Sequence, residues 1–306
     1  MILLCGIPSE SPLAMVATEL EALNVTYKFV NQRRALESWM SWEVAGGRIT
    51  GRLALENEEH RLEDVVGVYT RLMDDRILPE LESEPPNSPA RHHCRSFHEA
   101  LSRWYEVCPA RVVNRAAPQG SNSSKPYQAQ LIARYGFSIP ETLITNQPDL
   151  VREFQRTHGQ VIFKSISGVR SIVQILAEDD VARLDQIRWC PVQFQAFVPG
   201  TNVRVHTIGG EAFATEITSD VTDYRYASRF GGEATLRAID LPDDVTQGCL
   251  DLAEGLGLPF VGIDLKLAPD GRVFCFEVNP SPAFSYYEAN TGQPIARALA
   301  QYLAGA

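Results

Sequence analysis

The stretch that decides the fold runs from Pro259 to Phe284 and reads PFVGIDLKLAPDGRVFCFEVNPSPAF. Two runs of alternating apolar and polar residues flank Asp270-Gly271. This dipeptide between such runs predicts a β-hairpin with a two-residue turn. Counting back from that turn places Asp264 on the first strand directly opposite Glu277 on the second. The stretch therefore predicts two carboxylates that face each other across a hairpin.

The same register gives the hairpin one apolar and one polar face, because side chains alternate along a strand. The predicted apolar pairs, with the pair beside the turn, are Ile263–Val278, Leu265–Phe276, Leu267–Phe274 and Pro269–Arg272. The predicted polar face carries Gly262, Asp264 and Lys266 against Asn279, Glu277 and Cys275. A hairpin of this kind buries one face in a core and leaves the other for solvent or a ligand.

The polar face has the side chains of a magnesium site. Opposing side chains in a strand pair lie about 5 Å apart, so the two carboxylates favour a shared proton or a bound cation at neutral pH. Asn279 adds an uncharged oxygen, and Gly262 opposite it leaves room for a bulky group. Oxygen ligands that leave positions for water and phosphate suit Mg²⁺. The alternative is a solvated face on which Lys266 neutralises the acids, and the hairpin alone slightly favours it.

The composition is that of a globular protein without a large basic surface. The chain has 306 residues, a formal net charge of −10 and a pI near 5.2. This length allows two or three lobes, and the negative charge argues against nucleic acid or an anionic membrane as a partner. Six scattered cysteines without a CxxC pair, and the lack of a signal peptide or a long apolar run, predict a cytoplasmic protein.

The N-terminal part of the chain predicts a small α/β lobe. The expected elements are strands at 1–7, 25–30 and 65–69, a helix at 12–23 and a hairpin over 45–55 about Gly46-Gly47. The opening strand–helix–strand order predicts a parallel sheet. The turn after the first strand lacks a GxGxxG motif, so the sequence gives no support for nucleotide binding by this lobe.

A cluster of possible metal ligands lies on a predicted helix at 90–108. Its members are His92, His93, Cys94 and His98. Neighbouring residues on a regular helix point in different directions, so the cluster does not predict a metal site.

The remainder of the chain alternates helices and strands. The expected elements are helices at 126–136, 148–158, 243–257 and 292–303, strands at 161–164 and 191–198, and a hairpin over 201–218. Lys164 leaves a strand just before the small-residue loop 165–168, which is typical of a phosphate-binding lysine. A strand-end lysine that simply reaches water explains the position equally well, so both interpretations stay open. Arg204 alternates with apolar neighbours and therefore stands on the polar face of its hairpin.

Several motifs follow one another in the last three fifths of the chain. They are Asn122-x-x-Lys125 before a helix, VIFK at 161–164, QFQAFVPGTNVRV at 193–205, GIDL at 262–265, FEVNPSPAF at 276–284 and TGQPIA at 291–296. In this order they resemble the ATP-grasp superfamily and, within it, the RimK-like carboxylate–amine ligases. The resemblance covers about 121–306.

This resemblance implies an α/β (α+β) fold in which ATP is held between two α+β subdomains. The parts it implies are a small N-terminal α/β pre-ATP-grasp lobe at 1–115, a central lid subdomain at 116–198 and a C-terminal subdomain with the metal site at 199–306. The N-terminal lobe is similar to the family only in being a small α/β domain.

The resemblance also assigns residues to the nucleotide. Lys125 and Lys164 match the two lysines that contact ATP, and the loop after Lys164 matches the flap. The other nucleotide-binding residues that it implies are Ser167, Gly168, Gln195, Ala196, Phe197, Val198 and Asn202. The four hinge residues 195–198 match the segment whose backbone binds adenine. Ala196 and Asn202 depart from the family, which usually has an acid at each position.

The catalytic and metal-binding residues come from the same comparison of motifs. Arg204 matches the arginine that faces the phosphates, and Arg225 matches the arginine near the γ-phosphate and the acceptor. The residues that match the magnesium ligands are Asp264, Glu277 and Asn279. These are the side chains that the hairpin register groups on one face without reference to any family.

The activity implied by the resemblance is an ADP-forming ligase that acts on an amino acid or a peptide through an acyl phosphate. Its cofactors are ATP and Mg²⁺, with Mn²⁺ as an alternative metal ion, and a homodimer is usual in the family. A graspetide-type enzyme, which forms ester or amide crosslinks between side chains of a precursor peptide, is an alternative within this class. A non-catalytic ATP-binding module and a kinase on the same fold are alternatives outside it.

Overall fold

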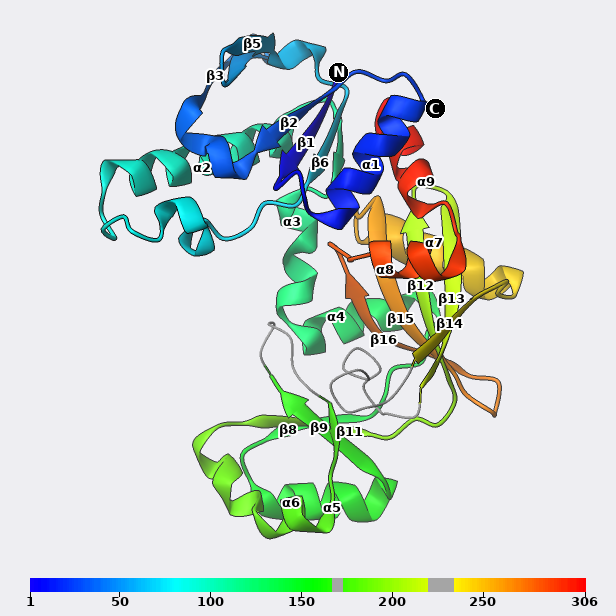
Figure 1. Ribbon diagram of the computed structural model, residues 1–306. Helices are drawn as coiled ribbons and strands as arrows, with labels where there is room; N and C mark the ends of the chain where they lie inside the picture. Colours follow the sequence, from blue (N-terminus) through cyan, green and yellow to red (C-terminus); the bar gives the residue numbers. More distant parts are fainter. Residues whose placement is uncertain (167–172, 220–233) are drawn as a thin grey trace.

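The computed structural model describes residues 1–166, 173–219 and 234–306. Figure 1 shows an N-terminal lobe at the top, a five-stranded sheet at the right and a smaller lobe at the bottom. The described residues form four sheets and combine parallel and antiparallel strands with packed helices.

The N-terminal lobe is built on a parallel sheet with the strand order β2-β1-β6-β7. The elements are β1 (Ile2–Gly6), α1 (Ser11–Ala22), β2 (Tyr27–Asn31), β3 (Ser38–Ala45), β4 (Arg48–Leu55), β5 (Glu58–Arg61), β6 (Gly67–Thr70), α2 (Pro89–Val107) and β7 (Arg111–Val113). The parallel pairing of β1 with β2 confirms the predicted strand–helix–strand opening. The hairpin about Gly46-Gly47 is also confirmed, although its first strand, β3, begins earlier than expected.

The smaller lobe, in the region for which the resemblance implies a lid, carries a second sheet with the order β10-β9-β11-β8. Its elements are β8 (Thr142–Thr145), α5 (Pro148–His158), β9 (Val161–Ser165), β10 (Gln174–Ile175), α6 (Glu178–Ala182) and β11 (Val192–Ala196). In Figure 1, α5 and α6 lie on the side of this sheet that faces away from the rest of the chain. Val151, Val161 and Phe194 are buried in its core.

The C-terminal subdomain has an antiparallel sheet with the order β14-β13-β12-β15-β16. Its elements are β12 (Thr201–Ile208), β13 (Glu211–Ser219), β14 (Ala234–Ile239), α7 (Asp243–Gly255), β15 (Phe260–Leu267), β16 (Val273–Asn279), α8 (Ser285–Thr291) and α9 (Ile295–Ala304). Leu252 of α7 packs with Val205 and Ile263 of the sheet in one buried cluster.

Two short helices, α3 (Ala116–Gln119) and α4 (Lys125–Ile132), lead from the N-terminal lobe toward the lid, and α4 lies beside β16. The 3₁₀ segments of the described chain are Gln32–Glu37, Leu62–Asp64, Asp75–Ile77, Pro79–Leu81, Gly120–Ser123, Ala133–Tyr135 and Leu184–Trp189. Among the described residues, no helix combines the length and the apolar character needed to cross a membrane.

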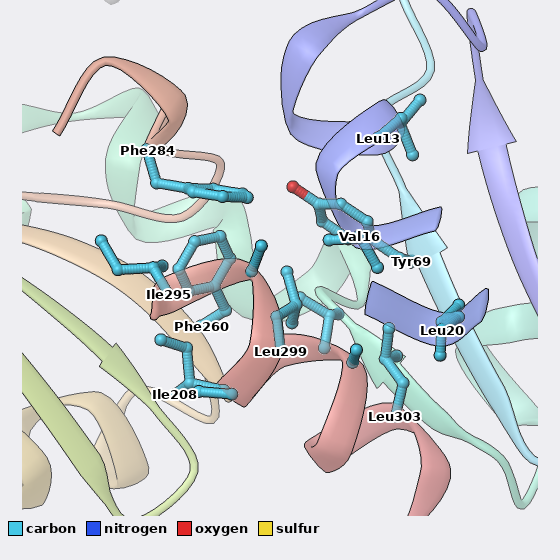
Figure 2. Packing of buried hydrophobic residues seen from close by; sticks show 14 of the residues in the cluster. Leu13, Val16, Leu20, Tyr69, Ile208, Phe260, Phe284, Ile295, Leu299 and Leu303 are labelled. Carbon is cyan, nitrogen blue, oxygen red and sulfur yellow. The ribbon is translucent and has the colours of Figure 1, made fainter. Parts of the chain in front are cut away.

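One hydrophobic core joins the two ends of the chain. Figure 2 shows Leu13 and Val16 of α1 on one side of this core and Leu299 and Leu303 of α9 on another. Phe260, at the start of β15, belongs to the same cluster and is 1% exposed. The strand that carries Asp264 is therefore anchored at its first residue in a core shared with the N-terminal lobe.

Candidate active site

The predicted hairpin is formed by β15 and β16, and it sets the two carboxylates opposite each other. The pairs at its far end are Asp264–Glu277, Ile263–Val278 and Gly262–Asn279. These three pairs confirm the predicted register where the candidate metal ligands lie. Both carboxylate side chains are partly exposed, so they remain accessible from the polar face.

Nearer the turn, the register differs from the prediction because the loop has three residues, 269–271, instead of two. The Gly271 N–H donates to the Ala268 carbonyl at 3.0 Å, and the Ala268 N–H donates to the Arg272 carbonyl at 3.0 Å. Gly271 has a φ of 86°, which suits the left-handed position of a three-residue hairpin loop. The predicted pairs Pro269–Arg272, Leu265–Phe276 and Leu267–Phe274 are therefore wrong, and the observed pairs are Leu265–Cys275 and Leu267–Val273.

A β-bulge restores the predicted register at the carboxylates. The pairing shifts by one residue between Asp264 and Leu265, and Phe276 is the extra residue on β16. The longer loop moves the pairing by one position and the bulge moves it back, so the two deviations cancel at Glu277. Bulges often redirect side chains beside active sites, and this one directly precedes a candidate metal ligand.

Because of the bulge, Cys275 and Phe276 each lie on the face opposite to the one predicted. Cys275, predicted on the polar face, is 1% exposed and belongs to the core between the sheet and α7. Phe276, predicted on the apolar face, lies near Lys266, whose Nζ is 6.0 Å from the Phe276 ring centre and 5.4 Å from that of Phe197. Partial burial lowers the pKa of Lys266. Lys266 thus packs against aromatic rings.

Each carboxylate contacts a cation from a different element. Lys125 Nζ, at the first residue of α4, lies 2.5 Å from Glu277 Oε1 and 2.7 Å from Asn122 Oδ1. Arg204, which pairs with Asp264 across β12 and β15, donates from Nη1 to Asp264 Oδ1 at 2.8 Å. Two acids and two cations therefore neutralise one another, and the partners come from the residues assigned to phosphate.

The space that Gly262 leaves open is filled by Arg204. A Cβ atom at Gly262 would overlap the Arg204 guanidinium group. Arg204 is 6% exposed, and its Cζ lies 5.7 Å from the centre of the Tyr287 ring. Packing on both sides therefore holds the guanidinium group beside Asp264.

The lid places the adenine-hinge candidates at the end of β11. The Gln195 amide donates to Thr142 Oγ1 at 3.1 Å, the Ala196 N–H donates to the Glu141 carbonyl at 2.9 Å, and the Phe197 N–H donates to the Gln160 carbonyl at 2.9 Å. The two backbone bonds hold residues 196 and 197 in place, and they use the N–H groups of Ala196 and Phe197. Lys164, on β9, pairs with Gln193 of β11 in the same sheet.

Not all candidate residues fall within the described chain. Asn202 stands two residues before Arg204 on β12, and Asn279 ends β16. Ser167, Gly168 and Arg225 lie outside the described residues. The structure thus brings Lys125 into contact with Glu277 and Arg204 into contact with Asp264, and the hinge candidates lie at the end of β11 in the neighbouring sheet.

Three side chains that no sequence motif indicated hold the end of β16 in place. Gln128 of α4, Asn114 after β7 and Arg71 after β6 hydrogen-bond to the backbone of residues 278–282. Their sequence separations from these partners exceed 145 residues, so no local pattern signals them.

The histidine and cysteine cluster on α2 points in several directions. His98 Nδ1 lies 3.8 Å from Cys94 Sγ, whereas His93 Nε2 lies 3.0 Å from the Ser38 carbonyl on β3. Across residues 1–166, 173–219 and 234–306, no group of three or more His, Cys, Asp or Glu side chains is placed to bind a metal ion. The candidate magnesium set differs, because it has two carboxylates and one amide.

A separate sheet beside a hairpin with two opposed carboxylates, each paired with a cation from another element, is the arrangement typical of ATP-grasp ligases. The RimK-like ATP-grasp domain matches residues 122–303, more than half of the chain, and the chain belongs to this family. The mixed α+β fold predicted from the motifs is confirmed.

The chain is similar to the probable alpha-L-glutamate ligase of Teredinibacter turnerae, with 26% identity over 218 residues that cover 68% of this chain and 71% of the relative. Its fold is similar to that of a RiPP-associated ATP-grasp ligase from Chryseobacterium gregarium in complex with ADP and a leader and core peptide. That similarity has a TM-score of 0.83 at 21% identity and covers 99% and 96% of the two chains. For the ATP-grasp ligase PsnB, complexed with a phosphomimetic precursor variant, Mg and ADP, the TM-score is 0.78 at 24% identity, with coverage of 99% and 97%.

Proposed function

We propose that this protein joins a carboxylate to an amine, or to a hydroxyl, at the expense of ATP. The carboxylate oxygen attacks the γ-phosphorus, the bond to the β–γ bridging oxygen breaks, and ADP leaves. The amine nitrogen then attacks the acyl carbon of the acyl phosphate, phosphate leaves, and the nitrogen loses a proton. The observation that carries the proposal is the pairing of Glu277 with Lys125 and of Asp264 with Arg204.

The residues present fit a magnesium ion. Asp264, Glu277 and Asn279 supply only oxygen ligands from one face of the hairpin, as Mg²⁺ prefers. Asn279 Oδ1 accepts the Ser281 N–H at 3.1 Å, and a carbonyl oxygen has a second lone pair for a metal ion. The metal ion would supply charge neutralisation between the phosphates, and Mn²⁺ has the same ligand preference.

The four charged groups allow the metal and the phosphates to enter without leaving a buried charge unpaired. Lys125 and Arg204 neutralise the carboxylates in the ligand-free protein. With a metal ion held by the carboxylates, Lys125 and Arg204 would be available to bind phosphate oxygens. We therefore assign Lys125, Lys164 and Arg204 to the phosphates, and Arg225 to the phosphate and acceptor end.

The hinge is proposed to bind adenine through its backbone. The N–H groups of Ala196 and Phe197 bond to the protein, and within the described chain the Val198 N–H has no backbone partner. Val198 is therefore the proposed donor to adenine. Lys266 Nζ lies over the rings of both Phe197 and Phe276, so these three side chains pack next to the proposed adenine donor. Asn202 is assigned to the ribose, and Ser167 and Gly168 to the flap.

Most of the rate enhancement would come from positioning and charge neutralisation, as in other phosphoryl transfers. Arg204, rigidly held beside Asp264, and Arg225 would stabilise negative charge on the transferring phosphoryl group and on the oxyanion formed later. No covalent enzyme intermediate is needed, because the acyl phosphate is itself the activated species.

We propose a peptide as the substrate, with a side-chain carboxylate as donor and a side-chain amine or hydroxyl as acceptor. Support comes from the two structural neighbours named above, which are complexes with precursor peptides and match nearly the whole chain, including the N-terminal lobe. The rival substrate is a free amino acid, favoured by the similarity to the probable alpha-L-glutamate ligase.

ADP release with panels of substrates tests the proposal. The purified protein, ATP and Mg²⁺ are combined with peptides that contain Glu or Asp together with Lys, Ser or Thr, and separately with free amino acids. We expect peptide-dependent ADP release and a product that has lost one water mass per new bond. Arg204→Met should lower the rate by orders of magnitude, whereas Arg237→Met, at an exposed arginine of β14, should not.

The other outcomes each identify a rejected function. A stable phosphorylated product without a new amide or ester would indicate a kinase. ADP release only with free amino acids would replace the peptide substrate by a small molecule. Nucleotide binding without ADP release under any acceptor would indicate a non-catalytic module.

A further inference from the structure

The two candidate ligands on β16 lie on the edge strand of their sheet. Within the described residues, β16 pairs with β15 on one side and with no complete strand on the other. An edge strand presents unpaired N–H and C=O groups and is held less firmly than a central strand. Glu277 and Asn279 therefore need another source of rigidity if their geometry is to be precise.

That source is the segment at 114–138, which hydrogen-bonds to several backbone groups along the open edge of β16. Near the turn, the Ser138 N–H donates to the Val273 carbonyl at 2.9 Å and the Cys275 N–H donates to the Ser138 carbonyl at 2.9 Å. Farther along, the Gln128 amide donates from Nε2 to the Val278 carbonyl at 2.8 Å, and the Val278 N–H donates to Gln128 Oε1 at 3.0 Å.

A glutamine amide has one carbonyl and one N–H group side by side, as a peptide unit does. Gln128 therefore offers Val278 the two hydrogen bonds that a neighbouring strand would offer. It is 1% exposed, so both bonds are shielded from water and losing either one leaves a buried polar group unsatisfied. Just beyond, the Asn114 amide donates to the Pro280 carbonyl at 2.5 Å.

Val278 lies between the two candidate ligands, and its own side chain is fully buried in the core. Since side chains alternate along a strand, fixing the Val278 backbone fixes the directions of Glu277 and Asn279 on the opposite face. Gln128 also lies three residues after Lys125 on α4, and Lys125 contacts Glu277. One turn of α4 thus fixes the position of the strand that carries the ligands and also of Lys125, which pairs with Glu277.

We propose that Gln128 is a positioning residue that aligns Glu277 and Asn279 for the metal ion. This inference rests on the proposed function, because it concerns the geometry of the same metal site. Side chains that orient metal ligands without touching the metal typically contribute 10–100-fold to metal affinity or activity. Gln128 acts one step further out, through its two bonds to the Val278 backbone between the ligands on β16.

The test measures Mn²⁺ affinity by electron paramagnetic resonance in the presence of a non-hydrolysable ATP analogue. The variants are Gln128→Ala and Gln128→Glu; the second keeps the shape and the acceptor but loses the donor to the Val278 carbonyl. We expect about 10–100-fold weaker Mn²⁺ binding, with binding of the analogue without metal unchanged and turnover restored by excess metal. Gln130→Ala, at an exposed glutamine of the same helix, should match wild type.

A stability control separates positioning from general destabilisation. Leu101→Ala removes a fully buried side chain from the N-terminal core and should lower the Tm without weakening Mn²⁺ binding. The inference is overturned if folded Gln128→Glu protein binds Mn²⁺ as wild type does, or if Leu101→Ala weakens binding equally. The proposed metal function then still stands. If wild-type protein itself does not bind Mn²⁺ with the analogue, the metal site and its alignment by Gln128 are both rejected.

Discussion

Gly262 links the packing of the sheet to the proposed chemistry, because its lack of a side chain makes room for Arg204. It pairs with Asn279 on β16 and lies under the guanidinium group of Arg204. Any side chain at this position would compete with Arg204 for space. Asp264, two residues along on the same face of β15, has room for its carboxylate. Arg204 can therefore occupy its position beside Asp264 only if residue 262 has no Cβ atom.

Gly262→Ala should displace Arg204 from Asp264 and lower turnover at least about tenfold, because small misplacements of catalytic groups are costly. Gly210→Ala is the matched control, since a Cβ atom at that turn position meets no atom within 4 Å. ADP release and thermal unfolding are measured for both variants. Wild-type turnover in Gly262→Ala would contradict the role given to this glycine.

His206 illustrates a second residue-scale property, a buried imidazole that is held neutral. It is 0% exposed, its ring centre lies 4.8 Å from that of Tyr287 and 6.3 Å from that of Phe260, and burial, helped by Arg204, lowers its pKa well below the ordinary value. Below about pH 6.5 the unfolded chain therefore binds a proton that the folded chain does not, and stability falls as the pH falls.

His206→Phe should make the free energy of unfolding less dependent on pH below about pH 6.5, by up to about 1.4 kcal/mol per pH unit. His98 contributes with the same sign, because burial lowers its pKa too, so the variant is compared with wild type by difference. Urea unfolding between about pH 5 and about pH 8 measures this slope. An unchanged slope would refute a neutral His206, and His92→Phe, at an exposed histidine, is the control.

At the scale of elements, α4 and the β15–β16 hairpin form one unit. The helix delivers Lys125 to Glu277 and Gln128 to Val278, so it contacts both a side chain and the backbone of the same strand. Under the proposed function, Lys125 and a metal ion would compete for the Glu277 carboxylate. Nucleotide phosphates would relieve this competition, because they would bind Lys125 in place of the carboxylate.

Lys125→Met should therefore have opposite effects on the two ligands. Without nucleotide, Mn²⁺ should bind several-fold more tightly, because Glu277 loses its cationic partner, whereas the ATP analogue should bind more weakly. Paramagnetic resonance for Mn²⁺ and calorimetry for the analogue give the two affinities. Weaker Mn²⁺ binding in the absence of nucleotide would contradict the competition; Lys28→Met, at a lysine paired with Glu58 in the N-terminal lobe, serves as the control.

At the scale of the whole molecule, α1, α9 and the five-stranded sheet share one core, so the N-terminal lobe helps to hold the strands of the candidate site in place. Figure 2 shows that α9 inserts Leu299 between residues of both parts. Arg71 adds a polar link across the same boundary: it pairs with Glu10 at 2.6 Å and donates to the Pro282 carbonyl at 3.2 Å. The lobe thus supports the loop that follows Asn279.

Leu299→Ala should lower the free energy of unfolding by about 2–5 kcal/mol, the usual range for a leucine removed from a tight core. Leu299 is 0% exposed, whereas Leu36, the control position, is 49% exposed. Urea unfolding followed by circular dichroism measures both alanine variants. A change below about 1 kcal/mol at Leu299 would show that the core does not join the two parts as described.

The hairpin was predictable because apolar and polar residues alternate on both sides of Asp270-Gly271. The three-residue loop and the bulge were not, since Phe274, Cys275 and Phe276 are all non-polar and fit either face. Their two register changes cancel, so the pairing of Asp264 with Glu277 survives an incorrect turn. The prediction was right at the carboxylates and wrong at 265–276 for this reason.

Other parts of the site depended on contacts that sequence patterns do not encode. The cationic partners of the carboxylates come from α4 and β12. From the sequence, Lys266 was the expected partner, because it is the nearest cation along the strand. Gln128 has no local signature, because its partner Val278 lies 150 residues away. The family motifs supplied Lys125 and Arg204, whereas physical reasoning from the hairpin alone did not.

The central claim, a metal–nucleotide site on the β15–β16 hairpin, is tested most directly by calorimetric titration of a non-hydrolysable Mg²⁺–ATP analogue into wild type and Glu277→Gln. Glu254→Gln, at an exposed glutamate of α7, is the control. We predict magnesium-dependent binding to wild type and to the control, and its loss in Glu277→Gln. Equal binding to all three proteins, or no binding to wild type, would contradict the claim.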